Sequence, residues 1–336
     1  MAAKSEKETP FAKYKLLEKY LKFINLKDDV AKNSFFNDAT FCDTKEKNLL
    51  FSSTLLVEHI DFDLAYFPLK HLGYKAIVSS MTDILAMNGT PTQVRINLAL
   101  SNRFTEEAID ALMSGIILCC SKYNIDIAGL DFKPSATGLY IATSMIGDVE
   151  PGQEVRRAGA QENELICVTG DLGSAYTGLI LLERENKVFQ VDPSQQPDFV
   201  GVDYLLERYL KPEPPMMELH KLTIHPSSMI NLKEGLATGL IHLCNASKLG
   251  CTVFEEKLPI EILTFDKLKE LGIVATTIAL NGGEDYELLF TIKQEDYEKI
   301  KELKEISVIG YMTAESAGRH IVTNDNKQFD LSAQGF

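Results

Sequence analysis

The sequence predicts two α+β or α/β domains, each built around a mostly antiparallel or mixed sheet. The chain has 336 residues, and at roughly 100–200 residues per domain this length suggests two domains. Segments with strand periodicity alternate with amphipathic helical segments along most of the chain. Pro151 and Gly152 form a turn-favouring pair near its middle. We place the boundary there, between domains at 13–150 and 151–336.

The first domain follows a polar segment, 1–12, which is predicted to be a flexible tail. Its clearest helix follows Thr105, a typical N-cap residue, with Glu106 and Glu107 in the first turn. The other elements expected here are a helix at 13–24, a strand at 47–57 interrupted by polar residues at 52–54, a helix at 72–87, and strands at 93–100, 125–129 and 138–147.

The second domain begins with a short buried strand at 165–169, which runs through a glycine turn into a helix ending near Glu185. A further helix is expected at 235–249, with Gly250 just past its end. The remaining segments are an exposed loop at 190–200, a helix at 201–210, a strand at 228–232, and alternating strands and helices at 260–272, 284–293, 295–304, 306–312 and 320–330.

Composition limits the classes of function. Lys and Arg number 34 against 48 Asp and Glu, a net charge of −14. This balance argues against nucleic-acid binding, because such proteins need cations to neutralise phosphates. The cysteines form no C-x-x-C pair and are expected to be free thiols in a reducing compartment. The chain has no apolar run near ~18 residues and no signal-peptide pattern, so we expect a cytoplasmic protein without membrane contact.

Three aspartates lie where packing alone does not explain them. Asp83 interrupts an otherwise apolar helix, and a buried carboxylate there would need a cation or hydrogen-bond donors. An exposed position on the helix is the alternative. The same two interpretations apply to Asp131, at a strand end, and to Asp38, between apolar neighbours. Each side chain either binds a ligand or is an ordinary surface or turn residue. Clustered carboxylates are how proteins hold the metal of a phosphorylated ligand.

Two loops combine polar groups with glycine or a helix start. Glu284 follows Asn281–Gly283, where glycines permit close backbone approach to a ligand or simply a tight turn. Asn231, Lys233 and Glu234 directly precede a helix. A phosphate or metal–phosphate would bind there, although Glu234 also favours the helix dipole.

The chain has no P-loop and no protein-kinase motifs. Composition and spacing alone therefore indicate a two-domain protein with suggestive carboxylates.

Taken in order, several segments resemble the thiamine-monophosphate kinase family, part of the superfamily of aminoimidazole ribonucleotide synthetase. The resemblance runs from about residue 30 to Phe336 and is strongest at 55–76, 82–93, 165–179 and NGGEDYELLFT (281–291). It implies an aminoimidazole ribonucleotide synthetase-like fold, with N-terminal domains that pair their sheets into a shared barrel of a homodimer. It also implies ATP- and Mg²⁺-dependent phosphorylation of thiamine monophosphate to thiamine diphosphate, which needs positioning and charge neutralisation more than covalent help.

The resemblance assigns roles to individual residues. The metal ligands it implies are Asp38, Asp83, Asp131, Asn231 and Glu234. The nucleotide contacts it implies are Ser52, Ser53, Leu130, Arg157 and Lys233. The catalytic pair is Glu234 and Lys233, and the substrate contacts are Asp61, Glu284 and Phe336.

The chain departs from the family pattern at the acidic motifs. The family has an acid at the positions of Thr54 and Asn231, a serine at Lys233 and a histidine at Asp61. Fewer ligand charges should weaken Mg²⁺ binding, because these sites depend on charge. The ammonium of Lys233 either replaces part of a metal's charge or repels the metal.

Three hypotheses follow from these departures. The first is an active kinase of the thiamine-monophosphate type with an edited, weakened site. The second is a non-catalytic paralogue that binds nucleotide, a thiamine-like ligand or an active partner. The third is a kinase or synthetase of the same fold with another substrate, which Asp61 and Phe132 suggest.

Overall fold

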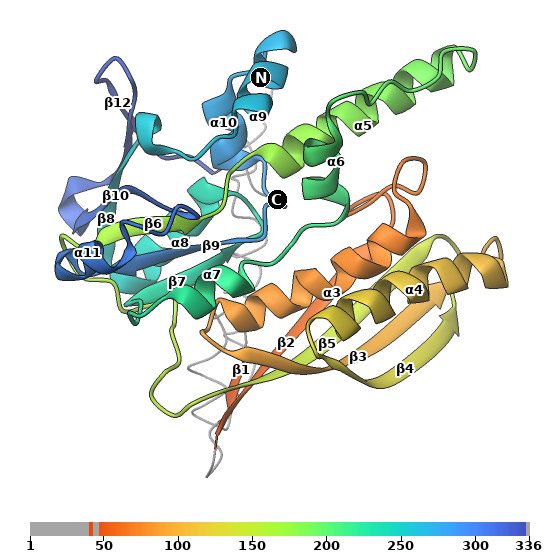
Figure 1. The fold of residues 1–336 in the computed structure, drawn as a ribbon, viewed down its shortest axis with the longest axis horizontal. Coiled ribbons are helices and arrows are strands. Elements are labelled where there is room, and N and C mark those ends of the chain that lie inside the picture. Colours follow the sequence, from red (N-terminus) through yellow and green to blue (C-terminus); the bar gives the residue numbers. More distant parts are fainter. Residues whose placement is uncertain (1–39, 43–46, 334–336) are drawn as a thin grey trace, which may run out of the picture.

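The computed structural model describes residues 40–42 and 47–333. The tail at 1–12, the helix expected at 13–24, and the site candidates Asp38 and Phe336 lie outside the described residues. Figure 1 shows two sheets, each with its own helices. Strands and helices alternate along the chain, which confirms the mixed class predicted from periodicity. The domain boundary at 150/151 stays a prediction.

The N-terminal half holds a five-stranded mixed sheet of order β1-β2-β5-β3-β4. Its strands are β1 (Thr40–Cys42), β2 (Asn48–Val57), β3 (Thr90–Leu100), β4 (Asp126–Pro134) and β5 (Leu139–Val149). Strands β3 and β4 are parallel, and the other pairs are antiparallel. Helices α3 (Leu69–Leu85) and α4 (Glu106–Lys122) cover one face (Figure 1). As predicted, Thr105 caps α4, accepting a hydrogen bond from the Ala108 amide.

The polar run at 52–54 does not interrupt strand β2, contrary to the prediction. The strand pairs with β5 over its full length. Its side chains alternate between buried and exposed, so the serines and threonine follow the same period as the leucines. Ser52 tolerates burial because its hydroxyl donates to the Ser80 carbonyl of α3 at 3.0 Å.

Helix α3 is buried along almost its whole length and lies between the first sheet and the C-terminal half (Figure 1). It crosses α4 closely because each helix has a glycine at the contact. A Cβ at Gly73 would lie 2.1 Å from the Leu112 carbonyl oxygen, and one at Gly115 would lie 1.8 Å from that of Lys70. Any larger residue would force the two helices apart. These glycines therefore fix the position of α3.

The C-terminal half holds a seven-stranded mixed sheet of order β12-β11-β8-β10-β6-β9-β7. Its strands are β6 (Leu165–Thr169), β7 (Ser228–Leu232), β8 (Leu249–Phe254), β9 (Glu287–Ile292), β10 (Ile306–Ala314), β11 (Arg319–Val322) and β12 (Gln328–Asp330). Its helices are α5 (Ser174–Val191), α6 (Asp203–Leu210), α7 (Met216–Lys221), α8 (Leu236–Ser247), α9 (Ile262–Glu270), α10 (Ala275–Asn281) and α11 (Tyr297–Ile300), with 3-10 turns at Glu255–Lys257, Gln294–Asp296 and Glu315–Ala317.

Two predicted helix ends are corrected by the structure. Helix α5 continues to Val191, beyond the end expected near Glu185. Helix α8 ends where Lys248 adopts a left-handed conformation with φ of 56°, a role the prediction gave to glycine. Gly250 lies instead within β8, where a neighbouring backbone carbonyl fills the space of a Cβ.

Three chain segments meet at one edge of the second sheet. Strands β6 and β7 both run antiparallel to β9, which lies between them. Their C-terminal ends therefore reach the same edge, where helices α5 and α8 begin. The loop 281–286 enters β9 at this edge as well. The turns at 170–173 and 233–235 thus flank that loop, at the kind of sheet edge where ligands commonly bind.

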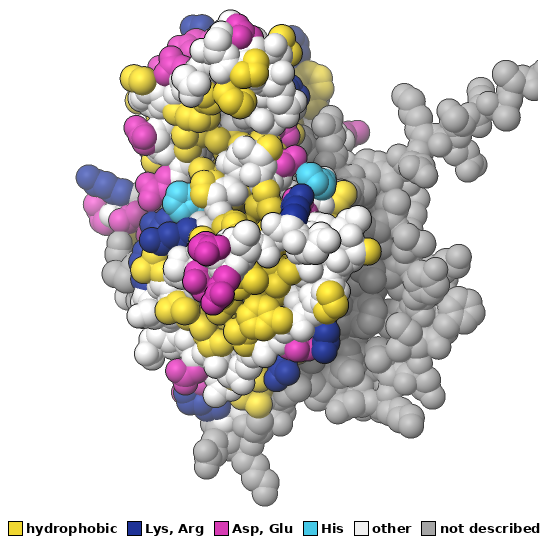
Figure 2. Space-filling model, turned by 90° about the vertical axis from the view of Figure 1, so that its right-hand side faces the viewer, with side chains coloured by type: hydrophobic (Ala, Val, Ile, Leu, Met, Phe, Trp, Pro, Cys, Tyr) yellow, Lys and Arg dark blue, Asp and Glu magenta, His cyan; other side chains and the backbone are white. Residues whose placement is uncertain are grey.

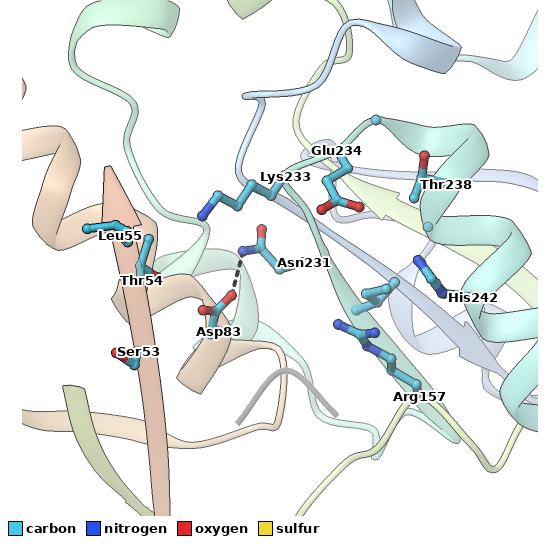
Figure 3. A pocket seen from close by; sticks show the side chains of 13 residues that line it. Ser53, Thr54, Leu55, Asp83, Arg157, Asn231, Lys233, Glu234, Thr238 and His242 are labelled. Atoms are coloured by element: carbon cyan, nitrogen blue, oxygen red, sulfur yellow. Dashed lines mark hydrogen bonds between the residues drawn. The ribbon is translucent and has the colours of Figure 1, made fainter. Parts of the chain in front are cut away.

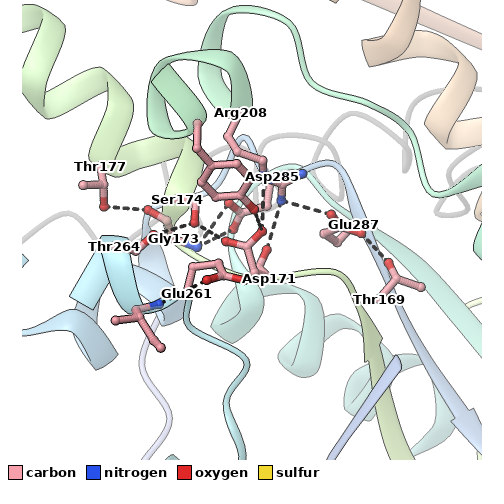
Figure 4. A network of polar contacts seen from close by, with 12 residues as sticks. Thr169, Asp171, Gly173, Ser174, Thr177, Arg208, Glu261, Thr264, Asp285 and Glu287 are labelled. Atoms are coloured by element: carbon pink, nitrogen blue, oxygen red, sulfur yellow. Dashed lines mark hydrogen bonds and ion pairs between the residues drawn. The ribbon is translucent and has the colours of Figure 1, made fainter. Parts of the chain in front are cut away.

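The β6 side of this edge is held by a buried charge network (Figure 4). The Arg208 Nε lies 3.2 Å from Asp171 Oδ1, and its Nη2 lies 3.0 Å from Glu287 Oε1. Asp171 also accepts a hydrogen bond from the Tyr204 hydroxyl at 2.6 Å. Glu287 accepts one from the Thr169 hydroxyl at 2.5 Å. One guanidinium therefore joins α6, the turn before α5 and strand β9.

A further carboxylate, Asp285, occupies the start of helix α5. Both of its oxygens accept the Gly173 amide at 3.1 Å (Figure 4), where the helix dipole favours negative charge. The side chain is 1% exposed, and burial raises its pKa to about 8, against the influence of Arg208 and the Gly173 amide. Burial and ion pairing therefore compete at this carboxylate.

Neither sheet closes into a barrel within 40–42 and 47–333, so the shared barrel of a dimer stays a prediction. In the same part of the chain, no helix combines the length and the apolar character needed to cross a bilayer. The cysteines at positions 119, 120, 167, 244 and 251 are buried free thiols, as expected.

We predict that Asp285→Asn changes how stability depends on pH. The folded protein keeps a proton on Asp285 up to about pH 8, whereas the unfolded chain releases it near pH 4. Wild-type stability therefore falls as pH rises between these values. The free energy of unfolding of Asp285→Asn, relative to wild type, should rise between about pH 5 and about pH 8 in urea titrations. Asp266→Asn, at an exposed position, is the control. The prediction is contradicted if the free energies of unfolding of Asp285→Asn and wild type differ by the same amount at both pH values.

Candidate active site

A cavity of about 380 Å³ lies on the β7 side of the same edge (Figure 3). Strand β2, helix α3, the loop after β5 and the start of α8 form its walls. The polar side chains that line it are Ser53, Thr54, Asp83, Arg157, Asn231, Lys233, Glu234, Thr238 and His242. Its volume is within the range of small-molecule sites. The cavity therefore brings together residues from both halves of the chain.

Two glycines allow the loops beside the cavity to pack closely. A Cβ at Gly235 would lie 2.8 Å from the Leu280 carbonyl oxygen, and one at Gly283 would lie 2.7 Å from that of Lys233. Both glycines have positive φ, 94° and 72° respectively. The Glu284 amide then donates to the Lys233 carbonyl at 2.9 Å. Gly235 and Gly283 thus serve loop packing next to the site.

Asp83 and Asn231 meet directly at the cavity. The Asn231 side-chain amide donates to Asp83 Oδ1 at 3.1 Å and to the Thr82 hydroxyl at 2.9 Å (Figure 3). The Asn231 Oδ1 is buried and has no hydrogen-bond partner among the described residues. A buried oxygen without a donor is costly. Its place in the cavity wall makes it a candidate ligand for a cation or a donor group.

Lys233 and Glu234 extend in different directions from the turn before α8. In Figure 3 the Lys233 ammonium points toward strand β2, whereas the Glu234 carboxylate turns toward Asn231. Arg157 reaches into the cavity from the loop after β5. Two cationic side chains and two carboxylates, Asp83 and Glu234, therefore surround Asn231. This mixture suits an anion bound together with a cation.

Helix α8 begins at the cavity wall. Gly235, Thr238 and Gly239 of its first turns line the cavity, and the N-cap Gly235 has no side chain that could cap the helix amides. Free amides at a helix start attract anions such as phosphate. The α8 start thus offers an anion site next to the buried oxygen of Asn231.

A second charged group lies beside the cavity. Lys75 of α3 is 2% exposed, and its ammonium lies 2.6 Å from Glu284 Oε2. Burial raises the pKa of Asp61, and the charges of Glu284, Lys233 and Lys75 also act on it. The structure therefore places Asp61 within electrostatic reach of Glu284, the other expected substrate contact that it describes. Lys75 is missed by sequence reasoning, although a charge in an apolar helix is the signal that singles out Asp83.

Three expected site residues lie away from the cavity in a single chain. Ser52 faces α3 through its bond to Ser80. Leu130 and Asp131 lie on β4, three strands from β2 in the sheet order, or about 14 Å at ~4.8 Å per strand. Asp131 lies 3.7 Å from the Lys133 ammonium and its side chain is 44% exposed. One chain alone does not bring these residues to the cavity.

A larger cavity, of about 580 Å³, lies on the other side of the edge, beside the charge network. Of the six carboxylates that line it, Asp171 and Glu287 are already paired with Arg208, and Asp285 occupies the α5 start. The smaller cavity, with an open helix start and an unpartnered oxygen, is therefore the candidate active site.

Comparison with known proteins identifies the family. Residues 36–149 match the family described as AIR synthase related protein, N-terminal domain. The chain is 31% identical over 287 residues to the thiamine-monophosphate kinase of Bacillus subtilis, covering 84% of this chain and 85% of that protein. The chain belongs to the thiamine-monophosphate kinase family. The resemblance seen in the motifs is thus confirmed.

Solved structures share the fold of this family member. A structure described as AaThiL complexed with AMPPCP and TMP has a TM-score of 0.80 at 23% identity, covering 97% of this chain and 96% of its own. Escherichia coli HypE, a hydrogenase maturation protein, has a TM-score of 0.68 at 17% identity, covering 92% and 89% respectively. Because proteins with different tasks share the fold, the substrate must be argued from the site.

We predict that Asn231→Asp strengthens the binding of Mg²⁺. The carboxylate would lie beside Asp83 without the amide hydrogen bond, so the two acids repel unless a cation lies between them. The apparent Mg²⁺ affinity in the presence of AMPPCP should rise by about tenfold, measured by isothermal titration calorimetry. Asn102→Asp, in an exposed turn, is the control for added charge. Unchanged or weaker Mg²⁺ binding would contradict the prediction.

Proposed function

We propose that this protein transfers a phosphate from ATP to thiamine monophosphate in the cavity between α3 and α8. The observation that carries the proposal is the meeting of Asp83, Asn231 and Glu234 at one cavity with the open start of α8. The family supports it, and so does the solved AaThiL structure described as complexed with AMPPCP and TMP.

The residues present fit a Mg²⁺ ion that binds together with the nucleotide. Within the described residues, no group of three or more His, Cys, Asp or Glu side chains could hold a metal. The cavity instead offers two carboxylates, Asp83 and Glu234, and the Oδ1 of Asn231. Mg²⁺ typically takes one or two carboxylates and completes its shell with waters and phosphate oxygens. When bound, the ion would neutralise charge on the transferring phosphate.

The side chains of the cavity then have distinct roles. The α8 start and Arg157 bind phosphate oxygens, and Ser53 contacts the nucleotide from β2. Lys233 neutralises charge on the transferring group, because its ammonium extends away from the α8 side and its charge reaches Asp61. Glu234 orients the nucleotide with its cation. Phosphoryl transfer depends on positioning and electrostatics, which these groups supply.

The departures from the family pattern point to a site with less negative charge. Asn231 replaces an acid with an amide, and Lys233 adds a positive charge, so we propose that the kinase binds Mg²⁺ more weakly than a site with both acids. The same hydrogen bond between Asn231 and Asp83 favours a second candidate, a non-catalytic nucleotide-binding paralogue, because it fills the space between two ligands without a metal.

A kinase assay decides between these candidates. Purified protein with ATP, millimolar Mg²⁺ and thiamine monophosphate should form thiamine diphosphate. Glu234→Gln should lower kcat/KM by about a hundredfold, because it removes the negative charge that holds the cation and so orients the nucleotide. Glu256→Gln, on an exposed 3-10 turn, serves as the control. Nucleotide binding with no turnover would support the non-catalytic paralogue instead.

We also propose a homodimer formed through the outer face of the first sheet. On this face Leu49, Phe51 and Leu55 of β2 are 40%, 42% and 55% exposed, and exposed apolar patches commonly mark interfaces. Hydrophobic side chains also gather in the lower half of the side shown in Figure 2. Ser53 shares this face and lines the cavity. A second copy would therefore lie beside the cavity and could supply its Asp131.

We predict that Phe51→Glu converts the dimer into a monomer. A charge at the centre of the apolar row would be buried unpaired in the interface, which is costly. Sedimentation velocity should show a mass of about 75 kDa for wild type, twice the 37.5 kDa chain, and a single-chain mass for the variant. Val191→Glu, at an exposed end of α5, should stay dimeric. A monomeric wild type refutes the proposed dimer.

A further inference from the structure

Lys75 is a buried cation enclosed by aromatic rings. Its ammonium lies 3.8 Å from the ring centroid of Tyr209, 5.3 Å from that of Phe67 and 6.0 Å from that of Tyr286. Burial lowers its pKa, and the neighbouring Glu284 carboxylate acts against this effect. Burial of an ammonium is costly, and a methionine would fill such an enclosure without that cost. Packing alone therefore does not explain a lysine here.

Glu284 has one oxygen fixed and one oxygen available. Its Oε2 lies 2.6 Å from the Lys75 ammonium and accepts the Tyr286 hydroxyl at 3.2 Å. In the described part of the chain, Oε1 receives no hydrogen bond, and the side chain is 27% exposed. The backbone has φ of 63°, which is unfavourable for a residue other than glycine. Such strain persists where the surroundings fix it, and it clusters at ligand contacts.

Asp61, which lies within electrostatic reach of Glu284, also has one oxygen fixed. Its Oδ2 accepts the Val57 amide at 2.7 Å, which leaves its other oxygen available. Burial raises the pKa of Asp61 and so does Glu284, whereas Lys233 and Lys75 lower it. Asp61 and Glu284 therefore each present one acceptor oxygen, which suits a ligand with N–H donors or positive charge.

We infer that Lys75 is a positioning residue of an acceptor subsite, in which it fixes Glu284 so that this carboxylate, together with Asp61, binds a cationic, amino-bearing heterocycle. The identity of the ligand rests on the proposed function, since thiamine monophosphate has a positively charged ring and an aromatic amine. Lys75 and Asp83 belong to the same helix, about two turns apart. Helix α3 thus positions groups for both the acceptor and the nucleotide.

The test compares full-length variants by isothermal titration calorimetry. Lys75→Met removes the charge but keeps the length, and Lys75→Gln keeps a donor for Glu284. Lys70→Met, exposed on the same helix, is the matched control. Lys75→Met should weaken binding of thiamine monophosphate by about tenfold or more, with binding of Mg²⁺–AMPPCP unchanged. Lys75→Gln should recover part of the affinity, and Lys70→Met should match wild type. Equal binding by Lys75→Met and wild type overturns the inference.

A double-mutant cycle tests whether Lys75 acts through Glu284. In a Glu284→Gln background, Lys75→Met should cause little further loss of affinity for thiamine monophosphate. Additive losses would show that Lys75 acts independently of Glu284 and would overturn the positioning role.

A ligand-free crystal structure separates this inference from the proposed function. In Lys75→Met the Glu284 carboxylate should leave its place beside residue 75, and an unchanged carboxylate position overturns the inference whatever the ligand. If Lys75→Met does not fold, Lys75→Gln is the second variant, and in it the Glu284 carboxylate should stay in place. A wild type that binds Mg²⁺–AMPPCP but no thiamine monophosphate would refute the proposed acceptor alone, and the crystal structure would still decide the role of Lys75.

Discussion

The burial of helix α3 is the constraint on which the rest of the structure depends. Glycines at its crossing with α4 hold it close, the first sheet packs against it, and β7 and α6 of the C-terminal half contact it as well. Charged groups on a helix enclosed in this way must find partners in the covering half, because unpaired buried charges are costly. Lys75 finds Glu284, and Asp83 finds Asn231. The polar contacts that assemble the site also join the two halves of the chain.

Asn231 shows how a change of one side-chain atom alters the chemistry of this junction. An aspartate there would face Asp83 with like charge, so the two halves would approach only with a cation between them. The amide instead donates to Asp83 and keeps an oxygen for a ligand. The junction can therefore form without a bound metal, and a ligand enters a site whose walls are already in place.

The sequence predicts the secondary structure near the site well, and the partners of its residues poorly. The bounds of β6 and β7 agree with the pattern because short apolar runs between turn residues allow little choice. Asp83 can be singled out because it interrupts an apolar helix. Lys75 carries the same signal, but its pairing with Glu284 joins residues more than two hundred positions apart. No local pattern encodes such contacts, and none shows that Asp131 lies three strands from the cavity.

The two helix starts at the edge of the second sheet are not equivalent. At α5 the Asp285 carboxyl group of the protein itself accepts the Gly173 amide, and at α8 no side chain caps the helix from the N-cap position. The buried Asp285 side chain leaves no place for a phosphate from solution at the first start. Of this pair, only the α8 start remains open to an external phosphate, so the proposed function implies one bound phosphate chain at this edge for each protein chain.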